Sequence, residues 1–293
     1  MERRFKIPQE TIDHLIDLAF EEDIGTGDIT TQTLIPPMLK TSAFFLAKSE
    51  GVLAGIEIAR RVFLKLDPEI KFKILIKDGS TIKTGDIIAE VRGKARAILT
   101  GERTALNFLQ RLSGIATLTS QFVAKVRDLP VMIIDTRKTI PGFRLLEKYA
   151  VKMGGGHNHR LNLTDGILIK DNHLALLRTS GKDLKDVVTQ AKKKAPHDLK
   201  VEVETTNLDE VREAVSARAN IIMFDNMSPA MMKRAVKLLT PGILSEASGG
   251  VNLESVRAIA ETGVNFISVG VLTHSSKALD ISLELQPLSP RAK

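Results

Sequence analysis

The chain has 293 residues, of which 43% are hydrophobic and 26% are charged, and its formal net charge is +7. That length and composition are ordinary for a globular protein of one or two domains, and no apolar run reaches the length that spans a bilayer. The charged start MERRFKIPQE lacks the apolar core of a signal peptide, so we expect a cytoplasmic protein without a membrane partner. The absence of cysteine excludes disulfides, thiolate zinc sites and cysteine nucleophiles.

The positive charge is spread along the chain, and its one tight basic run, residues 192–194, lies in a stretch with helical periodicity. We interpret that run as a solvated helix face. With one tyrosine, no tryptophan and no recognisable nucleic-acid-binding motif, the chain offers little on which bases could stack. We therefore expect no nucleic-acid partner and attribute the basic side chains to the binding of anionic metabolites.

In chain order, residues 1–112 are predicted to form an α+β domain with a mostly antiparallel sheet. Residues 7–22 carry apolar side chains at helical spacing, and residues 57–67 are a second helix candidate. After residue 70, extended runs alternate with turn signals at Asp78-Gly79 and Thr84-Gly85. This alternation is typical of short strands joined by tight turns.

Six apolar runs follow, each ending in polar, small or charged residues, at intervals of roughly 20 to 35 residues that match one βα unit. They are 131–139, 166–172, 199–206, 220–226, 242–250 and 266–270. Eight units would complete a (β/α)₈ barrel, so six predict an incomplete barrel around a parallel sheet. We place this catalytic domain at residues 113–274 and expect residues 275–293 to pack back on the first domain. Residues 99–128 lead into the barrel and are predicted to form two helices with a break near Ser113-Gly114.

The carboxyl ends of parallel strands lie together at the mouth of a barrel, where such folds bind ligands. Arg137 and Lys138 follow the first predicted strand, and Lys170 follows the second. Any one of these cations alone would be interpreted as a surface charge. Together, at two consecutive strand ends, they predict an anion-binding site, in which arginine suits a carboxylate and lysine a phosphate.

Two acids, Glu204 and Asp225, end the third and fourth predicted strands and should point into the same mouth. They could hold Mg²⁺ directly or through water, bind the hydroxyls of a sugar, or form structural ion pairs with the cations. Glu202 precedes Glu204 by two residues, and we expect it to point away from the site, with the strand-terminal acid as the functional one.

Two glycine turns, Ser248-Gly249-Gly250 and Ser268-Val269-Gly270, end the last two predicted strands. Short turns of this kind present backbone N–H groups to an anion, and barrels often bind a phosphate at their last two strands. His157 and His159 resemble the paired metal ligands of some barrel hydrolases, but they follow a glycine run rather than a strand. A metal-dependent hydrolase is therefore a minor alternative.

Long strings of this sequence resemble the quinolinate phosphoribosyltransferase family over nearly the whole chain. They are EDIGTGDITT (22–31), GERTALNFLQRLSGIAT (101–117), DTRKTIPGFR (135–144), GGGHNHRLNLTDGILIKDNH (154–173), VEVET (201–205), EASGG (246–250) and ISVG (267–270). The resemblance implies an N-terminal α/β sandwich domain followed by an incomplete (β/α) barrel, and a homodimer with shared active sites. It also implies transfer of phosphoribosyl from phosphoribosyl pyrophosphate to quinolinate, giving nicotinate mononucleotide, pyrophosphate and CO₂ in de novo NAD synthesis.

The resemblance further implies roles for the residues at the mouth. Arg103 would reach into the site of the partner subunit, and Thr136 would contact substrate. The groups implied to bind the quinolinate carboxylates are Arg137, His159, Arg160 and Lys170. The implied catalytic residues are Lys138, Lys170, Glu204 and Asp225, of which the two acids would hold the ribose hydroxyls and Mg²⁺, the one expected cofactor. The turns Ser248–Gly250 and Ser268–Gly270, Val269 included, would cradle the 5′-phosphate.

Two alternatives differ from this interpretation. A paralogue that acts on another acid without decarboxylation, such as one linked to molybdate metabolism, would lose part of the arginine cluster. The intact set of Arg103, Arg137 and Arg160 argues against it. A non-catalytic phosphate or nucleotide sensor could use the same barrel mouth, but it would not need Glu204 and Asp225.

Overall fold

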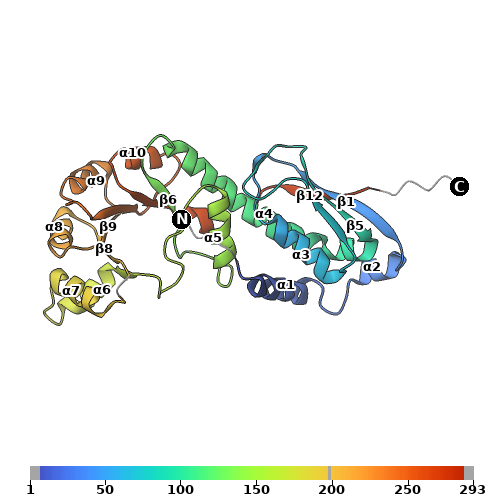
Figure 1. The fold of residues 1–293 in the computed structure, drawn as a ribbon, viewed down its shortest axis with the longest axis horizontal. Coiled ribbons are helices and arrows are strands. Elements are labelled where there is room, and N and C mark those ends of the chain that lie inside the picture. Colours follow the sequence, from blue (N-terminus) through green and yellow to red (C-terminus); the bar gives the residue numbers. More distant parts are fainter. Residues whose placement is uncertain (1–6, 197–198, 287–293) are drawn as a thin grey trace. The chain divides into compact units, whose positions relative to one another are not determined.

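The computed structural model describes residues 7–196 and 199–286, which form two compact units (Figure 1). Among the described residues, the first unit takes in those of Met1–Ser120, Leu145–Gly155 and Ser276–Lys293, and the second those of Gln121–Arg144 and Gly156–Ser275. The boundary predicted from the sequence, near residue 112, assigns residues 145–155 to the second unit, whereas in the structure they belong to the first.

The first unit is built on a four-stranded antiparallel sheet in the order β12-β1-β5-β3. Its strands are β1 (Lys40–Ala47), β3 (Lys71–Ile74), β5 (Ile87–Lys94) and β12 (Ile281–Gln286), and a short pair is formed by β2 (Gly51–Val52) and β4 (Thr81–Ile82). β12 pairs with β1, so that Leu283 lies opposite Phe45. The predicted antiparallel sheet is confirmed, and residues 287–293 of the C-terminal segment lie outside the described residues.

Three helices accompany this sheet: α1 (Gln9–Asp23), α2 (Ile29–Leu34) and α3 (Ile56–Leu66). α1 and α3 correspond to the two predicted helices. α3 buries one side of its surface, and its Phe63 ring lies 6.1 Å from Phe45 and 6.0 Å from Phe72, centroid to centroid. Aromatic side chains of this size contribute a large buried apolar area, so this cluster anchors the helix on the sheet.

Helix α4 (Ala95–Val126) is a single helix of 32 residues, so the predicted break near Ser113-Gly114 is wrong. Gly114 is required inside the helix because a β-carbon there would collide with the backbone carbonyl of Lys277. The glycine therefore allows two backbone segments to pack closely instead of ending the helix. Despite its length, neither α4 nor any other helix in the described ranges is apolar enough to cross a membrane.

Most of helix α5 (Arg144–Met153) packs in the first unit, although the sequence analysis placed it in the barrel. Buried Glu147 accepts a hydrogen bond from Arg111 at 2.7 Å. Tyr149 donates one to Asp78 at 2.7 Å. These partners are 36 and 71 residues away along the chain, so no local pattern could reveal the placement.

The second unit is built, among the described residues, on six parallel strands in the order β6-β11-β10-β9-β8-β7. They are β6 (Met132–Ile134), β7 (Ile167–Ile169), β8 (Val201–Thr205), β9 (Ile221–Asp225), β10 (Leu244–Ser248) and β11 (Phe266–Ser268). Each strand lies within the run predicted for it. β6 and β7 are the two edges of the sheet, so the predicted incomplete barrel is confirmed.

Helices connect these strands and lie outside the sheet (Figure 1). They are α6 (Asp171–Arg178), α7 (Leu184–Lys194), α8 (Leu208–Ser216), α9 (Pro229–Val236) and α10 (Val256–Ala260), and α11 (Val271–His274) follows β11, the last strand of the sheet along the chain. Because side chains of a strand alternate between its two faces, Val201 and Val203 of β8 are buried, and α7 and α8 pack against that strand. The residues that alternate with these valines along β8 face the barrel interior. The fold thereby directs polar side chains inward.

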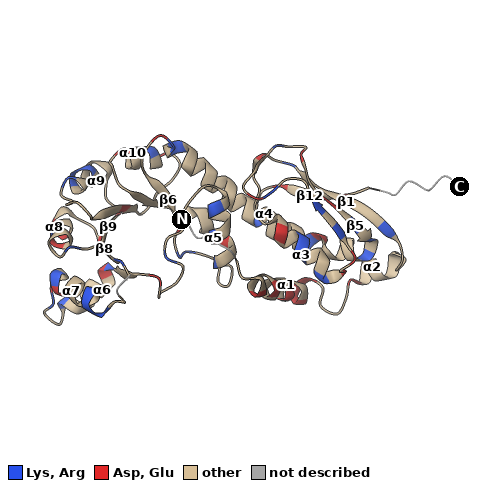
Figure 2. Ribbon diagram, in the orientation of Figure 1, with Lys and Arg blue, Asp and Glu red and all other residues tan. Residues whose placement is uncertain are grey.

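Basic and acidic residues are interspersed over both units (Figure 2). The lysine run 192–194 is exposed on the last turn of α7, where positive charge interacts favourably with the helix dipole. Its position supports the interpretation of a solvated helix face.

Asp28 caps the amino terminus of α2. Its carboxylate accepts hydrogen bonds from the Thr31 N–H at 2.9 Å and the Thr100 hydroxyl at 3.0 Å. The Thr31 hydrogen bond, aided by that of Thr100, holds the pKa of Asp28 below its ordinary value of 3.8. A carboxyl with a lowered pKa in the folded state stabilises the fold fully above its unfolded pKa, and this contribution is lost as the pH falls through the folded value.

We expect Asp28→Ala to lower the free energy of unfolding by about 1 kcal/mol near neutral pH, the usual cost of losing a cap. The difference from the wild type should shrink below pH 3.8. Urea denaturation followed by circular dichroism measures both effects, with exposed Glu22→Ala as the control that should change little. A wild-type midpoint for Asp28→Ala at neutral pH would contradict the capping role.

Candidate active site

Two cavities lie within the second unit. The mouth cavity, of about 520 Å³, is lined by residues at the carboxyl ends of the strands. The inner cavity, of about 460 Å³, is lined by residues nearer the amino ends. On β9, for example, Asp225 lines the mouth cavity and Ile221 the inner one, whereas His159, Arg160 and Glu246 line both. The two cavities therefore meet at a layer formed by these three side chains.

The mouth cavity brings together most of the residues predicted from the sequence. Those that line it are Thr136, Arg137, Lys138, His159, Arg160, Lys170, Glu204, Asp225, Ser248, Gly249, Gly250 and Ser268. Val269 is fully buried, and a β-carbon on Gly270 would lie 3.3 Å from the Lys138 side chain, so these two residues support the mouth from behind. Arg103 is exposed on α4 in the first unit, and its role in a partner's site stays a prediction.

Three further residues, to which no role was assigned from the sequence, also line the mouth cavity: Asp135, Asn226 and Glu246. Asp135 is fully buried and accepts hydrogen bonds from the His159 N–H at 2.9 Å and the Asn158 amide at 2.7 Å. Glu246 lies two residues before Ser248 on β10. The two-residue period of a strand places both on one face, and that was the available signal.

Arg137 and Arg160 bring two guanidinium groups to the mouth cavity. Burial and the positive charge of Arg137 both lower the pKa of Arg160, so the two cations are close enough to repel each other. The Nε of Arg137 is buried and has no hydrogen-bond partner among the described residues. Two like charges with an unused buried donor favour an anion that contacts both, and a carboxylate matches their geometry.

Lys138 is exposed at the mouth on a backbone that is held in place. Its N–H donates to the Thr136 hydroxyl at 3.0 Å, and its carbonyl accepts from the Thr273 hydroxyl at 2.7 Å. The ammonium group is therefore carried on a restrained loop and remains available to a phosphate oxygen.

Glu204 and Asp225 end the adjacent strands β8 and β9. Burial raises the pKa of Glu204, the charge of Lys170 opposes this rise, and the negative charge of Asp225 adds to it. Lys170 Nζ lies 3.4 Å from Glu204 Oε2, but its side chain is 47% exposed, so this ion pair is loosely held. Two carboxylates that repel each other at an open mouth are a suitable donor set for a hard divalent cation.

The turn after β10 packs against the turn after β9. Asn226 has a left-handed backbone with φ of 53°, and its N–H donates to the Ser248 carbonyl at 2.9 Å. A β-carbon on Gly249 would collide with the Asn226 side chain, so glycine is required there. Within the described ranges, the N–H groups of Gly249 and Gly250 donate to no other protein group. They are available to an anion at the mouth.

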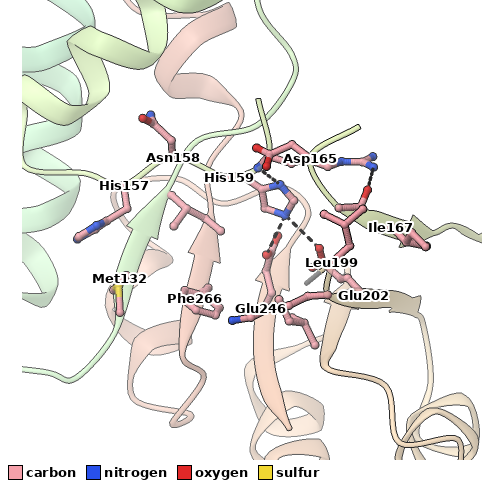
Figure 3. A pocket seen from close by; sticks show the side chains of 15 residues that line it. Met132, His157, Asn158, His159, Asp165, Ile167, Leu199, Glu202, Glu246 and Phe266 are labelled. Atoms are coloured by element: carbon pink, nitrogen blue, oxygen red, sulfur yellow. Dashed lines mark hydrogen bonds and ion pairs between the residues drawn. The ribbon is translucent and has the colours of Figure 1, made fainter. Parts of the chain in front are cut away.

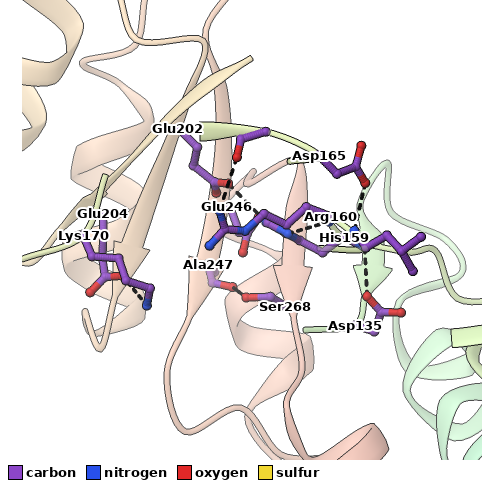
Figure 4. A network of polar contacts seen from close by, with 12 residues as sticks. Asp135, His159, Arg160, Asp165, Lys170, Glu202, Glu204, Glu246, Ala247 and Ser268 are labelled. Atoms are coloured by element: carbon purple, nitrogen blue, oxygen red, sulfur yellow. Dashed lines mark hydrogen bonds and ion pairs between the residues drawn. The ribbon is translucent and has the colours of Figure 1, made fainter. Parts of the chain in front are cut away.

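The buried His–Glu cluster, which consists of the half-buried His159 and the buried Glu202 and Glu246, lies beneath the mouth (Figures 3 and 4). His159 Nε2 is 3.1 Å from Glu202 Oε2 and 3.3 Å from Glu246 Oε2, and its Nδ1 accepts the Arg160 N–H at 2.7 Å. The expectation that Glu202 points away is wrong. It shares the inward face of β8 with Glu204 and lies deeper, because residues two apart on a strand face the same side.

The protons of this cluster are shared among its three groups. Burial alone would lower the pKa of His159, but the hydrogen bonds to Glu202 and Glu246 outweigh it and raise the pKa to about 10. Burial also raises the pKa of Glu202. The bond from Arg160 suits an Nδ1 without a proton, which would place that proton on a carboxylate instead. In both arrangements the cluster holds one negative charge fewer than its two carboxylates alone.

The cluster also has the donor types of a metal site, since one imidazole nitrogen and two carboxylate oxygens lie within 4.8 Å of one another. The Oε1 atoms of Glu202 and Glu246 are buried and lack a hydrogen-bond partner in the described part of the chain. The mouth acids and the buried cluster are thus two separate sets of potential ligands.

Comparison with known proteins identifies the family. Residues 28–113 match the family model of the quinolinate phosphoribosyl transferase N-terminal domain, and residues 115–284 match that of its C-terminal domain. The chain belongs to the quinolinate phosphoribosyltransferase family. The predicted family and fold class are thereby confirmed.

Relatives in this family match over almost the full chain. The probable carboxylating nicotinate-nucleotide pyrophosphorylase of Bacillus subtilis (strain 168) is 46% identical over 271 residues, with 92% of each chain covered. The chloroplastic carboxylating nicotinate-nucleotide pyrophosphorylase of Arabidopsis thaliana is 42% identical over 294 residues, covering 95% of this chain and 84% of the relative. The solved structure of the nicotinate-nucleotide pyrophosphorylase from Francisella tularensis has a TM-score of 0.91 at 42% identity, covering 98% of this chain and 100% of that one.

Proposed function

We propose that this chain transfers the phosphoribosyl group of phosphoribosyl pyrophosphate to quinolinate with loss of CO₂, forming nicotinate mononucleotide and pyrophosphate in de novo NAD synthesis. The observation that carries the proposal is the composition of the mouth cavity. One cavity combines two arginines, two lysines, the strand-terminal acids Glu204 and Asp225, and a glycine turn with available N–H groups, in a chain of the quinolinate phosphoribosyltransferase family.

The quinolinate end of the site is formed by the arginines. Arg137 and Arg160 are held close together despite their like charges, and a substrate with two carboxylates would offset both. Lys170 follows β7, the other edge strand of the sheet, and lines the same cavity, where it can face the carboxylate that is lost. We also assign Arg103 of a partner subunit to this end, which makes the functional unit a homodimer with shared sites.

The phosphoribosyl end is formed by the acids and the glycine turns. Glu204 and Asp225 would bind the ribose hydroxyls and hold Mg²⁺, directly or through water, because their carboxylates repel each other and match the oxygen ligands that Mg²⁺ prefers. When bound, Mg²⁺ would offset negative charge on the pyrophosphate leaving group. The N–H groups of Gly249 and Gly250 would cradle the 5′-phosphate.

The reaction requires little chemistry from the protein. The ring nitrogen of quinolinate attacks the anomeric carbon as the bond to pyrophosphate breaks, and positive charge builds on the ribose. Glu204 and Asp225 stabilise that charge, while Lys138 stabilises the departing pyrophosphate. The bond between C2 and its carboxylate then breaks, CO₂ leaves, and the electron pair stays on C2 beside the positive ring nitrogen until C2 takes up a proton from solvent. Before that step the protein needs to hold the carboxylate oriented and shielded from water. This accounts for a site without a cysteine or an activated serine nucleophile.

The direct test incubates the purified protein with quinolinate, phosphoribosyl pyrophosphate and Mg²⁺, and follows CO₂ and nicotinate mononucleotide. Nicotinate, which lacks the second carboxylate, is the matched control substrate and should give little product. Absence of both products from quinolinate would refute the proposed function. A cytoplasmic location stays a prediction of the sequence.

The shared site has its own test in mixed subunits. Arg103→Ala and Lys138→Ala should each be nearly inactive. After subunit exchange, half of the dimers are hybrids with one intact site, so activity should recover to about a quarter of the wild-type value. Subunit exchange is monitored by native mass spectrometry of isotopically labelled protein. Exchanged subunits without recovered activity would contradict the assignment of Arg103 to the partner's site.

A further inference from the structure

The buried His–Glu cluster lies in the wall between the two cavities, because His159 and Glu246 line both of them. Glu202 and Glu246 are only 5% and 1% exposed. Both carboxylates direct an oxygen toward the same atom, Nε2 of His159, at 3.1 and 3.3 Å (Figure 4). The wall of the mouth cavity thus contains two acids that are held together by one imidazole.

These acids conflict with the proposed substrates. The proposed function, on which this inference rests, places a dianionic acid and a phosphorylated sugar in the mouth cavity. Two carboxylates in the wall would repel both ligands, and the low dielectric of the interior would strengthen the repulsion. Arg137 and Arg160 would also attract the protein's own acids, which would weaken their attraction for the two ligands. His159, which lies between the two carboxylates, offsets one of their two charges and so reduces this repulsion.

The ring of His159 is also fully engaged within the chain. Nε2 faces the two carboxylates, and Nδ1 accepts the N–H of Arg160 at 2.7 Å. Its backbone N–H donates to buried Asp135 at 2.9 Å. A direct hydrogen bond from the ring to a substrate carboxylate would break one of these contacts. Through its Nδ1, in contrast, His159 fixes the backbone of Arg160, whose side chain lines the mouth cavity.

We propose that His159 is a positioning residue, which offsets one of the two negative charges of Glu202 and Glu246 and orients Arg160, and that its ring does not itself contact the substrate acid. This differs from the role that the family resemblance implies for His159, a ligand of the quinolinate carboxylate. The two roles make opposite predictions when the buried acids are removed together with the histidine.

The test compares His159→Ala with His159→Ala/Glu246→Gln and His159→Ala/Glu202→Gln. Dissociation constants for quinolinate are measured by calorimetry, and KM and kcat in the full assay. His159→Ala should weaken quinolinate binding at least about tenfold, because it leaves buried carboxylates uncompensated. A glutamine in place of one acid removes a charge and donates to the other acid. Either double variant should therefore bind quinolinate at least about threefold better than His159→Ala, with recovery mainly in KM.

The control is His159→Ala/Glu254→Gln, which changes an exposed glutamate of the same unit and should behave as His159→Ala does. Circular dichroism verifies that each variant is folded. If folded double variants bind quinolinate no better than His159→Ala, the positioning role is refuted and direct contact is favoured, while wild-type turnover still supports the proposed function. If the wild type neither turns over nor binds quinolinate, the proposed function itself fails.

A second measurement does not depend on the stability of these variants. In protein labelled with ¹⁵N on histidine, the ring resonances of His159, assigned with His159→Gln, should not move on saturation with quinolinate. A large shift of either ring nitrogen would overturn the proposal. So would a stoichiometric transition metal that elemental analysis finds in the wild type and not in His159→Ala, because the metal would then offset the carboxylates.

Discussion

The double variant Glu204→Gln/Asp225→Asn should lower kcat/KM for the quinolinate reaction by about a thousandfold or more, the scale of losing preorganised charge at a transition state. Both substitutions keep the shape of the side chain and remove the negative charge that would stabilise the ribose cation and hold Mg²⁺. The fold should persist, because both side chains line the mouth cavity, and burial, together with the charge of Asp225, raises the pKa of Glu204 and so disfavours its charged form. Steady-state kinetics and a thermal melt measure the two effects.

The matched control is Glu254→Gln/Asp186→Asn, which removes the same charges from exposed positions of the same unit and should retain full turnover. Unchanged turnover in Glu204→Gln/Asp225→Asn would exclude the transferase mechanism. Ligand binding without turnover in the wild type and in the double variant would instead favour a non-catalytic sensor.

The largest loss of stability is expected for Gly114→Ala. The added methyl group would meet the carbonyl of Lys277, a backbone atom that cannot move aside as a side chain can. Overpacking costs about 1–3 kcal/mol or more, whereas alanine improves helix propensity by only about 1 kcal/mol. We expect a net loss of about 2 kcal/mol and a melting temperature lower by about 5 °C or more, measured by calorimetry.

Gly101→Ala is the comparison within the same helix. Its β-carbon would lie 2.8 Å from Leu66 Cδ1 and 3.1 Å from ring atoms of Phe63, which are side-chain atoms that can shift. Both variants gain the same helix propensity, so the difference between them reports the backbone collision. Equal melting temperatures for Gly101→Ala and Gly114→Ala would show that the contact with Lys277 is not limiting.

The barrel and its mouth could be predicted because their signals are local. Each parallel strand is a short apolar run, and parallel topology places every strand's carboxyl end at the same edge. That rule alone brought Lys138, Lys170, Glu204 and Asp225 together, and the structure lines one cavity with all four. The same two-residue period would have placed Glu202 inward as well, had it been applied to the whole strand rather than to its last residue.

Sequence alone determined where the six strands lie along the chain, the residues that end them and the family to which the chain belongs, because these follow from periodicity and from motifs contiguous along the chain. Only the tertiary structure decided that α4 runs through Gly114, that residues 145–155 pack in the first unit and that His159 lies between Glu202 and Glu246. Each of these depends on a partner far away in the sequence, such as the Lys277 carbonyl beside Gly114. From the sequence alone, a glycine that ends a helix cannot be distinguished from one that allows a neighbouring backbone segment to pack closely.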